Sequence, residues 1–438
     1  MFILLKGEAT VTNTEEIYLC IDLKSFFASV ECAERGLDPM TTNLVVADPD
    51  RSTGTICLAV TPAMKALGVR NRCRVYEIPK NIKYIMAPPR MQKYIDYAAN
   101  IYGIYLRYIS RDDIFVYSID EAFINIAPYL KKYSMNAHEF AVFLMNKISS
   151  ELGIRASAGI GTNLYLTKIA LDVTAKHSPD SIGYLDEELY RKTLWDHRPL
   201  TDFWRIGEGT ARRLAKHGIY TMRQIALMDE DVLYREFGID AELLIDHAWG
   251  IEPTTIADIK AYRPKTTSLT SGQVLMRDYT FSEGRLILRE MMDLLALDMV
   301  SKNVVTASVS LWVGYTARAN IPPARGSAAL DIRTNSDKLL IPAVTRIYEH
   351  IVDPSVPVRR ISISVNDLTE DDPAGAQLSL IPTPALDAEL SKSRKIQEAV
   401  LGLKHRYGAD AVLKGMNFEP AATTRERNHQ IGGHKSGL

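Results

Sequence analysis

The chain has 438 residues, 46% of them hydrophobic, and a formal net charge of −1 at pH 7. This length allows roughly three domains of about 150 residues with their own cores, and no stretch approaches the about 20 apolar residues of a membrane span, so we expect a cytoplasmic protein. Net charge neither supports nor excludes a nucleic-acid partner, but residues 391–438 carry nine Lys and Arg against four Asp and Glu, and residues 204–223 carry five against one.

The first part of the chain alternates β-rich and helical patterns. Residues 15–22 have the apolar run of a buried strand, whereas residues 137–152 place apolar side chains at four-residue steps. The predicted elements are a strand over 15–22, helices over 24–36 and 91–109, two short strands within 112–128, a helix over 137–152, and a strand over 155–161 leading into a helix that ends at Leu171. Strands interleaved with helices indicate an α/β fold class.

The second part divides into three patterns. Only short helices are expected over residues 185–250, and a connector with two prolines follows over 251–265. The next elements are a strand near 267–276, a helix over 282–301, strands near 303–314 and 325–333, a helix over 337–352 and a strand over 357–366. This βαββαβ order predicts a four-stranded sheet with two helices on one face. The last 70 residues or so begin as a Pro-rich linker and contain one expected helix, over 393–408.

Acidic residues stand at two places about 100 residues apart. Asp22 ends the first strand, and Asp120 and Glu121 lie between two short strands. A lone Asp at a strand end is usually a turn or cap residue. An adjacent acidic pair with apolar flanks is harder to explain that way, because burying it unpaired is costly. Such oxygen ligands suit Mg²⁺ or Mn²⁺. Enzymes that transfer phosphoryl groups use pairs of such ions about 4 Å apart.

Longer segments around these residues resemble a known family. IDLKSFFASVE at 21–31 and YSIDEAFIN at 117–125 are similar to the two carboxylate motifs of the Y-family DNA polymerases, in order and spacing. ASAGIGTNLYLTKIALDVTAKH at 156–177 resembles the third palm segment of the family, and the likeness continues to about residue 367. RERNHQIGGHKSG at 425–437 is similar to UmuC-type members from Gram-positive bacteria and their mobile elements, rather than to the DinB type.

The resemblance implies a multidomain α/β (α+β) fold shaped like a right hand. The implied domains are a palm over 1–23 and 91–184, small fingers over 24–90, a helical helix-hairpin-helix thumb over 185–250, a linker over 251–265, a βαββαβ little finger over 266–368 and a C-terminal tail over 369–438. The implied function is error-prone, template-directed translesion DNA synthesis in DNA repair and SOS mutagenesis, by two-metal transfer from a dNTP to a primer 3′-hydroxyl with release of pyrophosphate. No segment resembles a proofreading exonuclease.

The resemblance also assigns metal ligands. Asp22 and Asp120 are expected to bridge two Mg²⁺ ions, with Mn²⁺ as the alternative ion. Glu121 is expected to complete the site of the catalytic metal, and the Leu23 carbonyl to reach the nucleotide-bound metal.

On the nucleotide side, the start of the helix after Asp22 favours an anionic triphosphate. Phe26 and Phe27 lie there, and Phe27 occupies the family's steric-gate position, although an aromatic residue in such a helix is usually a core residue. Lys176 matches the triphosphate-contacting lysine, with a solvated helix-end lysine as the alternative. The chain departs from the common pattern where many members have Tyr and Arg, since it has Pro62 and Lys65. We expect Lys65 to contact the nucleotide and Pro62 not to do so. Thr61, next to Pro62, is only a further candidate.

Two other segments predict partners. Residues 203–226 resemble a helix-hairpin-helix in which the backbone of Gly207 and Gly209 approaches a DNA phosphate and nearby side chains supply charge, although a helix C-cap explains the glycines nearly as well. These cationic residues are Arg212, Arg213 and Lys216. QLSLI at 377–381 looks like a sliding-clamp-binding peptide, with a plain linker as the alternative. Its expected contacts are Gln377, Leu378, Leu380 and Ile381. Primer-template DNA, dNTPs and a sliding clamp are thus the expected partners, with a recombinase filament or other accessory proteins as further candidates.

Three alternatives remain open. The chain could be a non-catalytic homologue that binds DNA and clamp as a scaffold, although all three carboxylates are intact. It could be another palm-type nucleotidyl transferase such as a cyclase, for which the thumb, little finger and clamp peptide are superfluous. The four cysteines, Cys20, Cys32, Cys57 and Cys73, match no metal spacing and are expected to be reduced thiols, with a disulfide or redox role as the alternative.

Overall fold

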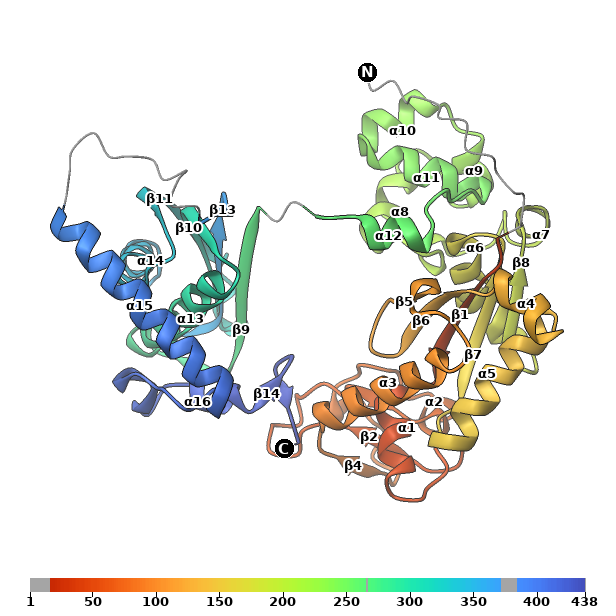
Figure 1. The fold of residues 1–438 in the computed structure, drawn as a ribbon, viewed down its shortest axis with the longest axis horizontal. Coiled ribbons are helices and arrows are strands. Elements are labelled where there is room, and N and C mark those ends of the chain that lie inside the picture. The colour runs from red at the N-terminus through yellow and green to blue at the C-terminus, as the bar shows by residue number, and fades with distance from the viewer. Residues whose placement is uncertain (1–15, 265–266, 372–383, 438) are drawn as a thin grey trace. The chain divides into compact units, whose positions relative to one another are not determined.

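The computed structural model describes residues 16–264, 267–371 and 384–437. The chain divides into two compact units, and the boundary lies between Tyr262 and Arg263 (Figure 1). Within the described ranges, no helix is both long enough and apolar enough to cross a membrane. All four cysteines are free thiols with buried side chains.

The first unit is built on a five-stranded sheet with the order β5-β6-β1-β7-β8. The central strand β1 is antiparallel to both of its neighbours, and β7 is parallel to β8. A three-stranded sheet with the order β3-β2-β4 lies in the segment between α1 and α3. The strands are β1 Tyr18–Leu23, β2 Leu44–Val46, β3 Ala59–Val60, β4 Ile85–Ala87, β5 Ile114–Val116, β6 Glu121–Asn125, β7 Ala156–Gly161 and β8 Ile182–Leu185.

Helices cover both faces of the main sheet (Figure 1). Side chains alternate along β1, so that Leu19, Ile21 and Leu23 enter the core made with α1, α3 and α5. Tyr18 and Cys20 point to the opposite face, toward α6. The helices are α1 Phe26–Ala33, α2 Pro62–Ala66, α3 Met91–Leu106, α4 Ala127–Tyr133, α5 Ala137–Leu152, α6 Leu164–Ile169, α7 Glu187–Thr193, α8 Glu208–Ala215, α9 Met222–Ala226, α10 Glu230–Phe237, α11 Asp240–Trp249 and α12 Ile256–Ala261. Asp22, two residues beyond Cys20, therefore belongs to the face that α6 covers.

Glycines in β7 allow α6 to lie close to this face. A Cβ on Gly159 would stand 2.2 Å from the backbone oxygen of Thr167, and one on Gly161 would stand 2.5 Å from its backbone nitrogen. Both distances are shorter than a Cβ atom can approach a non-bonded heavy atom, so only glycine fits at these positions. The close approach brings the side chains of α6 within reach of the end of β1.

The connector after residue 250 is partly helical. Helix α12 lies within the predicted linker 251–265 and packs on β5 and β6, with Ile256 only 3% exposed. The sequence predicted a connector here but not this helix. The segment has few apolar residues, and only Ile256 and the partly buried Ile259 of this helix pack on the core, so its apolar pattern was too weak to predict a helix.

The second unit confirms the βαββαβ prediction. Its strands form an antiparallel sheet with the order β11-β10-β12-β9, and α13 and α14 share the core on one face. The elements are β9 Ser268–Tyr279, α13 Phe281–Ser301, β10 Val304–Tyr315, β11 Ala324–Thr334, α14 Asp337–Ile351, β12 Val358–Asn366, β13 Thr369–Glu370, α15 Pro384–Tyr407, α16 Thr424–Asn428, β14 Gln430–Ile431 and β15 His434–Lys435.

Residues 384–436 of the predicted tail belong to this unit. Helix α15 begins before the predicted residue 393 and packs on α13 and α14. Glu290 of α13 is 1% exposed, and its carboxylate accepts hydrogen bonds from the Asn417 side chain at 2.7 Å and from the Thr423 backbone at 2.8 Å. The buried side of α15 includes Ser393 and Gln397, which explains why its apolar periodicity is too weak to predict the packing.

Candidate active site

The three predicted carboxylates converge where β1 ends and β6 begins. Asp22 is paired in register with Glu121 on the neighbouring strand, so both side chains belong to the same face of the sheet. Asp120 comes directly before β6, and its carbonyl accepts a hydrogen bond of 2.9 Å from the Leu23 backbone nitrogen. The Ser118 hydroxyl donates to Oδ1 of Asp120 at 2.6 Å. Strand pairing thus joins two acidic motifs that lie about 100 residues apart in the chain.

Negative charge is concentrated at this point. Burial, followed by repulsion from Asp120 and Glu121, raises the pKa of Asp22 to about 7. A bound cation would oppose all three effects, so the donor set fits a hard divalent metal. In the described part of the chain, no group of three or more His, Cys, Asp and Glu side chains is already arranged as a metal-binding cluster.

Lys168 forms an ion pair with one carboxylate of the cluster. Its ammonium lies 2.8 Å from Oε1 of Glu121 and 3.0 Å from Asp172, and its side chain is only 9% exposed. The Cys20 thiol donates to the same oxygen of Glu121 at 3.2 Å. Lys168 was not among the site residues predicted from the sequence. Its spacing of four residues from Asp172 in TKIALD was a signal for an ion pair on a helix, but nothing local pointed to Glu121.

The N-terminal end of α1 lies next to this acidic cluster. Ser25 has a left-handed backbone with φ of 51°, and its buried Oγ has no hydrogen-bond partner among the described residues. The first-turn N–H groups of a helix and an unpaired hydroxyl suit an anionic ligand. Phe26 is 2% exposed and packs in the core, so only its backbone is available to a nucleotide.

The Phe27 ring is supported from α3. It stacks on Tyr94 with ring centroids 4.5 Å apart and an interplanar angle of 17°. The Tyr94 hydroxyl donates at 2.9 Å to Oε1 of Glu31, one turn further along α1. Phe27 is therefore held in one orientation by a side chain that is itself fixed by a hydrogen bond.

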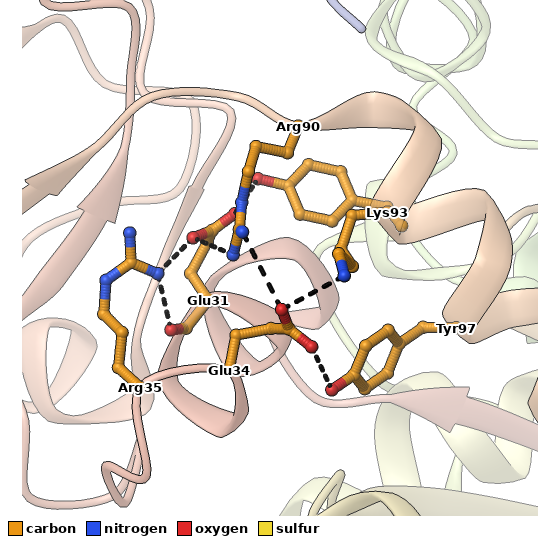
Figure 2. A network of polar contacts seen from close by, with 7 residues as sticks. Glu31, Glu34, Arg35, Arg90, Lys93 and Tyr97 are labelled. Atoms are coloured by element: carbon orange, nitrogen blue, oxygen red, sulfur yellow. Dashed lines mark hydrogen bonds and ion pairs between the residues drawn. The ribbon is translucent and has the colours of Figure 1, made fainter. Parts of the chain in front are cut away.

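Glu31 is the centre of a polar network between α1 and α3. Figure 2 shows its carboxylate between Arg35, which lies just after α1, and Arg90, which lies just before α3. Arg90 donates two hydrogen bonds of 2.9 Å to it, one to each oxygen. Burial acts to raise the pKa of Glu31, but the hydrogen bonds from Arg90, Arg35 and Tyr94 outweigh it and lower the pKa below its ordinary value. The network fixes the position of α1 against α3.

Lys65 interacts electrostatically with Asp22 of the cluster and with Lys176. Burial lowers the pKa of Lys65, the Asp22 charge raises it, and the Lys176 charge lowers it further, which shows that these groups share one electrostatic environment. Thr61 has no free hydroxyl for a ligand. It is fully buried, caps α2 by accepting from the Met64 backbone, and donates to the Thr42 carbonyl at 2.8 Å.

Sequence comparisons agree with this arrangement. Residues 21–172 match the model of the impB/mucB/samB family, and residues 266–380 match that of its C-terminal domain. The "Putative UV-damage repair protein UvrX" of Bacillus subtilis strain 168 is 30% identical over 95% of this chain and 97% of its own length. The chain belongs to the impB/mucB/samB family. The resemblance to Y-family polymerases is thereby confirmed.

Other relatives of this Y-family member fit the same assignment. "DNA polymerase IV 2" of Bacillus subtilis strain 168 is 29% identical over 96% of this chain and 99% of its own length. A Y-family DNA polymerase chimera of known structure has the same fold, with a TM-score of 0.60 and 18% identity over 81% of this chain and 99% of that one. The relatives are named both UvrX and DNA polymerase IV, so assignment to the UmuC-type branch stays a prediction.

The predicted DNA-binding turn of this Y-family chain begins a helix. Gly207 is the N-cap of α8 and Gly209 lies in its first turn, which excludes the alternative of a C-cap. A Cβ would meet no atom within 4 Å at either position, and neither residue has a positive φ. Neither packing nor backbone conformation therefore requires glycine here. Glycine instead leaves an exposed backbone without side chains, which another molecule can approach closely.

The cationic side chains after this turn are exposed but not equally available. Arg213 forms an ion pair with Glu236 at 2.8 Å and lies over the Phe237 ring. Arg212 donates to the Glu208 carbonyl, and Lys216 is the C-cap of α8. The predicted clamp-binding residues 377–381 lie outside the described residues.

Proposed function

We propose that the protein copies damaged DNA by transferring a nucleotide from a dNTP to a primer 3′-hydroxyl at Asp22, Asp120 and Glu121. As a Y-family member the chain is a DNA-directed DNA polymerase, and the activity of its family is translesion synthesis in DNA-damage repair. The observation that supports the site is the convergence of three carboxylates, which raises the pKa of Asp22 to about 7 through burial and mutual repulsion.

Two Mg²⁺ ions, with Mn²⁺ as the alternative, suit this oxygen-rich site. We assign as their ligands Asp22, Asp120, Glu121 and the carbonyl of Leu23. When bound, such ions would make the primer hydroxyl a better nucleophile and stabilise the pyrophosphate that leaves. Both contacts of Glu121 use Oε1, so Oε2 is the oxygen that we assign to metal binding. Lys168 orients this carboxylate and offsets part of its charge.

The residues around α1 are assigned to the triphosphate and the sugar. We assign an anion-binding surface to the region next to the acidic cluster. It would consist of the backbone at the start of α1, the Ser25 hydroxyl, Lys65 and Lys176. Phe27 is assigned as the steric gate, because a fixed flat ring excludes a ribose 2′-hydroxyl.

DNA would be held by the glycine-containing turn of the first unit and by the sheet of the second. The sheet face opposite α13 and α14 has a shallow depression of about 490 Å³ lined mainly by serines, Trp312 and Arg325. Small hydroxyl side chains with an arginine suit a phosphate backbone rather than base edges. We therefore expect DNA affinity to fall with rising salt and to depend little on sequence.

The function is tested by primer extension with Mg²⁺ on an undamaged template and on templates with an abasic site or a bulky adduct. Wild-type protein should extend the undamaged primer and add nucleotides opposite at least one lesion, with and without a sliding clamp and recombinase filament. DNA binding without extension under all these conditions would instead identify a scaffold.

Replacing Phe27 with alanine should allow ribonucleotide incorporation, because the ring that blocks the 2′-hydroxyl is lost. We expect the preference for dNTP over rNTP to fall by about two orders of magnitude, corresponding to about 3 kcal/mol of steric discrimination. Replacing Phe26 with leucine is the control, since Phe26 is buried and its side chain does not face the nucleotide. Unchanged sugar selectivity in the Phe27 variant would show that another residue is the gate.

Clamp binding is proposed for residues 377–381. Changing Gln377 and Leu380 together to alanine should abolish binding of the purified protein to a sliding clamp in a pull-down or titration. Basal primer extension without clamp should not change. Retained clamp binding would assign the segment as a linker.

A further inference from the structure

Trp204 joins the glycine-containing turn to the acidic site. It lies three residues before Gly207, and its indole nitrogen donates a hydrogen bond of 3.1 Å to the Tyr117 hydroxyl. The two rings meet edge to face with centroids 5.9 Å apart, and the Trp204 ring also lies 6.2 Å from Phe123 of β6. These contacts connect segments 87 positions apart in the sequence.

Tyr117 begins the turn that carries Asp120, here called the acidic turn (residues 117–120). The backbone nitrogens of Tyr117 and Ser118 donate to the Glu121 carbonyl at 3.0 and 3.1 Å. The Ser118 hydroxyl then donates to the Asp120 carboxylate at 2.6 Å. A displacement of Tyr117 would therefore move Asp120, because the backbone hydrogen bonds to Glu121 and the Ser118–Asp120 hydrogen bond connect them.

The residues that follow Trp204 in the chain form the predicted DNA-binding turn. Arg205 has a left-handed backbone with φ of 72°, and its guanidinium lies 5.0 Å from the centre of the Trp204 ring. A non-glycine residue in this conformation is strained, and such strain persists only where surrounding contacts hold it. Trp204 supplies such a contact immediately before the turn of Gly207 and Gly209.

Burial alone does not explain the Trp204–Tyr117 hydrogen bond. Tyr117 is 43% exposed, so its hydroxyl could bond to water without any partner in the protein. The indole nitrogen of Trp195, by contrast, donates at 2.7 Å to the Ala248 carbonyl, within the helical region over residues 185–250. Of these two indole hydrogen bonds, the one from Trp204 reaches the acidic turn.

We propose that Trp204 and Tyr117 are positioning residues that hold the acidic turn in register with the DNA-binding turn. The contact sets the distance between the DNA backbone at Gly207 and Gly209 and the carboxylate of Asp120. This inference rests on the proposed polymerase function. Its effect is on the rate of nucleotide transfer, since misplacing a reacting group by about 1 Å can cost about 100-fold in rate.

The test compares Tyr117→Phe, Trp204→Phe, the double variant and Trp195→Phe with wild type. Single-turnover primer extension gives the maximal transfer rate and the dNTP dissociation constant, fluorescence anisotropy gives DNA affinity, and thermal unfolding gives stability. Trp195→Phe is the matched control, because it loses an indole hydrogen bond without touching the acidic turn.

We expect the maximal transfer rate to fall about tenfold in each single variant, as the loss of one hydrogen bond and a small displacement would produce. DNA affinity and the dNTP dissociation constant should stay within twofold of wild type. The double variant should fall no further than the more affected single variant. Trp195→Phe should lose thermal stability but keep its transfer rate.

Two results would overturn the positioning role. One is a wild-type transfer rate in Tyr117→Phe, and the other is a loss in the double variant equal to the product of the two single losses. An inactive wild-type protein would overturn the proposed function instead.

Discussion

Replacing Asp120 with asparagine is expected to reduce nucleotide transfer by about 1,000-fold or more. The change keeps the side-chain volume and leaves an oxygen to accept from Ser118, but it removes the charge assigned to bridging the two metals. Metal-assisted charge stabilisation is worth several kcal/mol, and each 1.4 kcal/mol or so is a factor of ten in rate. Single-turnover primer extension with Mg²⁺ measures the loss.

DNA binding and folding should survive this substitution. Because Asp120 repels Asp22, removing its charge should leave the midpoint of thermal unfolding unchanged or higher. Asp112→Asn is the matched control: it makes the same chemical change at an exposed site before β5 and should keep full activity. If the Asp120 variant retained more than about a tenth of the wild-type rate, the assignment of this residue to metal binding would be wrong.

Replacing Glu31 with glutamine should destabilise the first unit by about 3 kcal/mol. Its side chain is fully buried, and the change leaves Arg35, Arg90 and the Tyr94 hydroxyl without the charge that they bind. Breaking a buried ion pair from one side costs about 3–5 kcal/mol. We expect the lower end, because Arg35 and Arg90 are 33% and 29% exposed and can regain water. Urea unfolding followed by a probe in the first unit measures the change.

Glu34 provides the control in the same network (Figure 2). It receives Lys93 at 3.2 Å and the Tyr97 hydroxyl at 2.9 Å, but its side chain is 25% exposed. Glu34→Gln should therefore cost no more than about 1 kcal/mol. Equal losses in the two variants would mean that burial of Glu31 does not determine its contribution.

The same carboxylate predicts a dependence on pH. The folded-state pKa of Glu31 is lowered, so its contribution to stability is complete above the ordinary pKa of a glutamate and is lost as the pH falls through the folded-state value. The difference in unfolding free energy between wild type and Glu31→Gln should thus shrink in acid. A constant difference across this range would contradict the network as described.

Local patterns in the sequence were enough to predict most elements and the acidic site. The four-residue spacing of Phe140, Leu144 and Ile148 predicted α5, and all three are fully buried. The order of strand and helix patterns over residues 267–366 predicted the βαββαβ unit. These signals are local, because helix and strand periods are set by the backbone itself. Packing that depends on one or two residues escaped prediction, as in α12 and in the segment after residue 384.

The sequence by itself determined which residues form the acidic cluster, since Asp22, Asp120 and Glu121 lie in motifs with a fixed order and spacing. Only the tertiary structure decided what surrounds them: Lys168 on Glu121, Tyr94 beneath Phe27, and Trp204 against Tyr117. The physical reason is distance along the chain. Each of these partners is tens of residues away and meets its counterpart only because of how helices pack on the sheet, as the close approach of α6 over Gly159 and Gly161 illustrates.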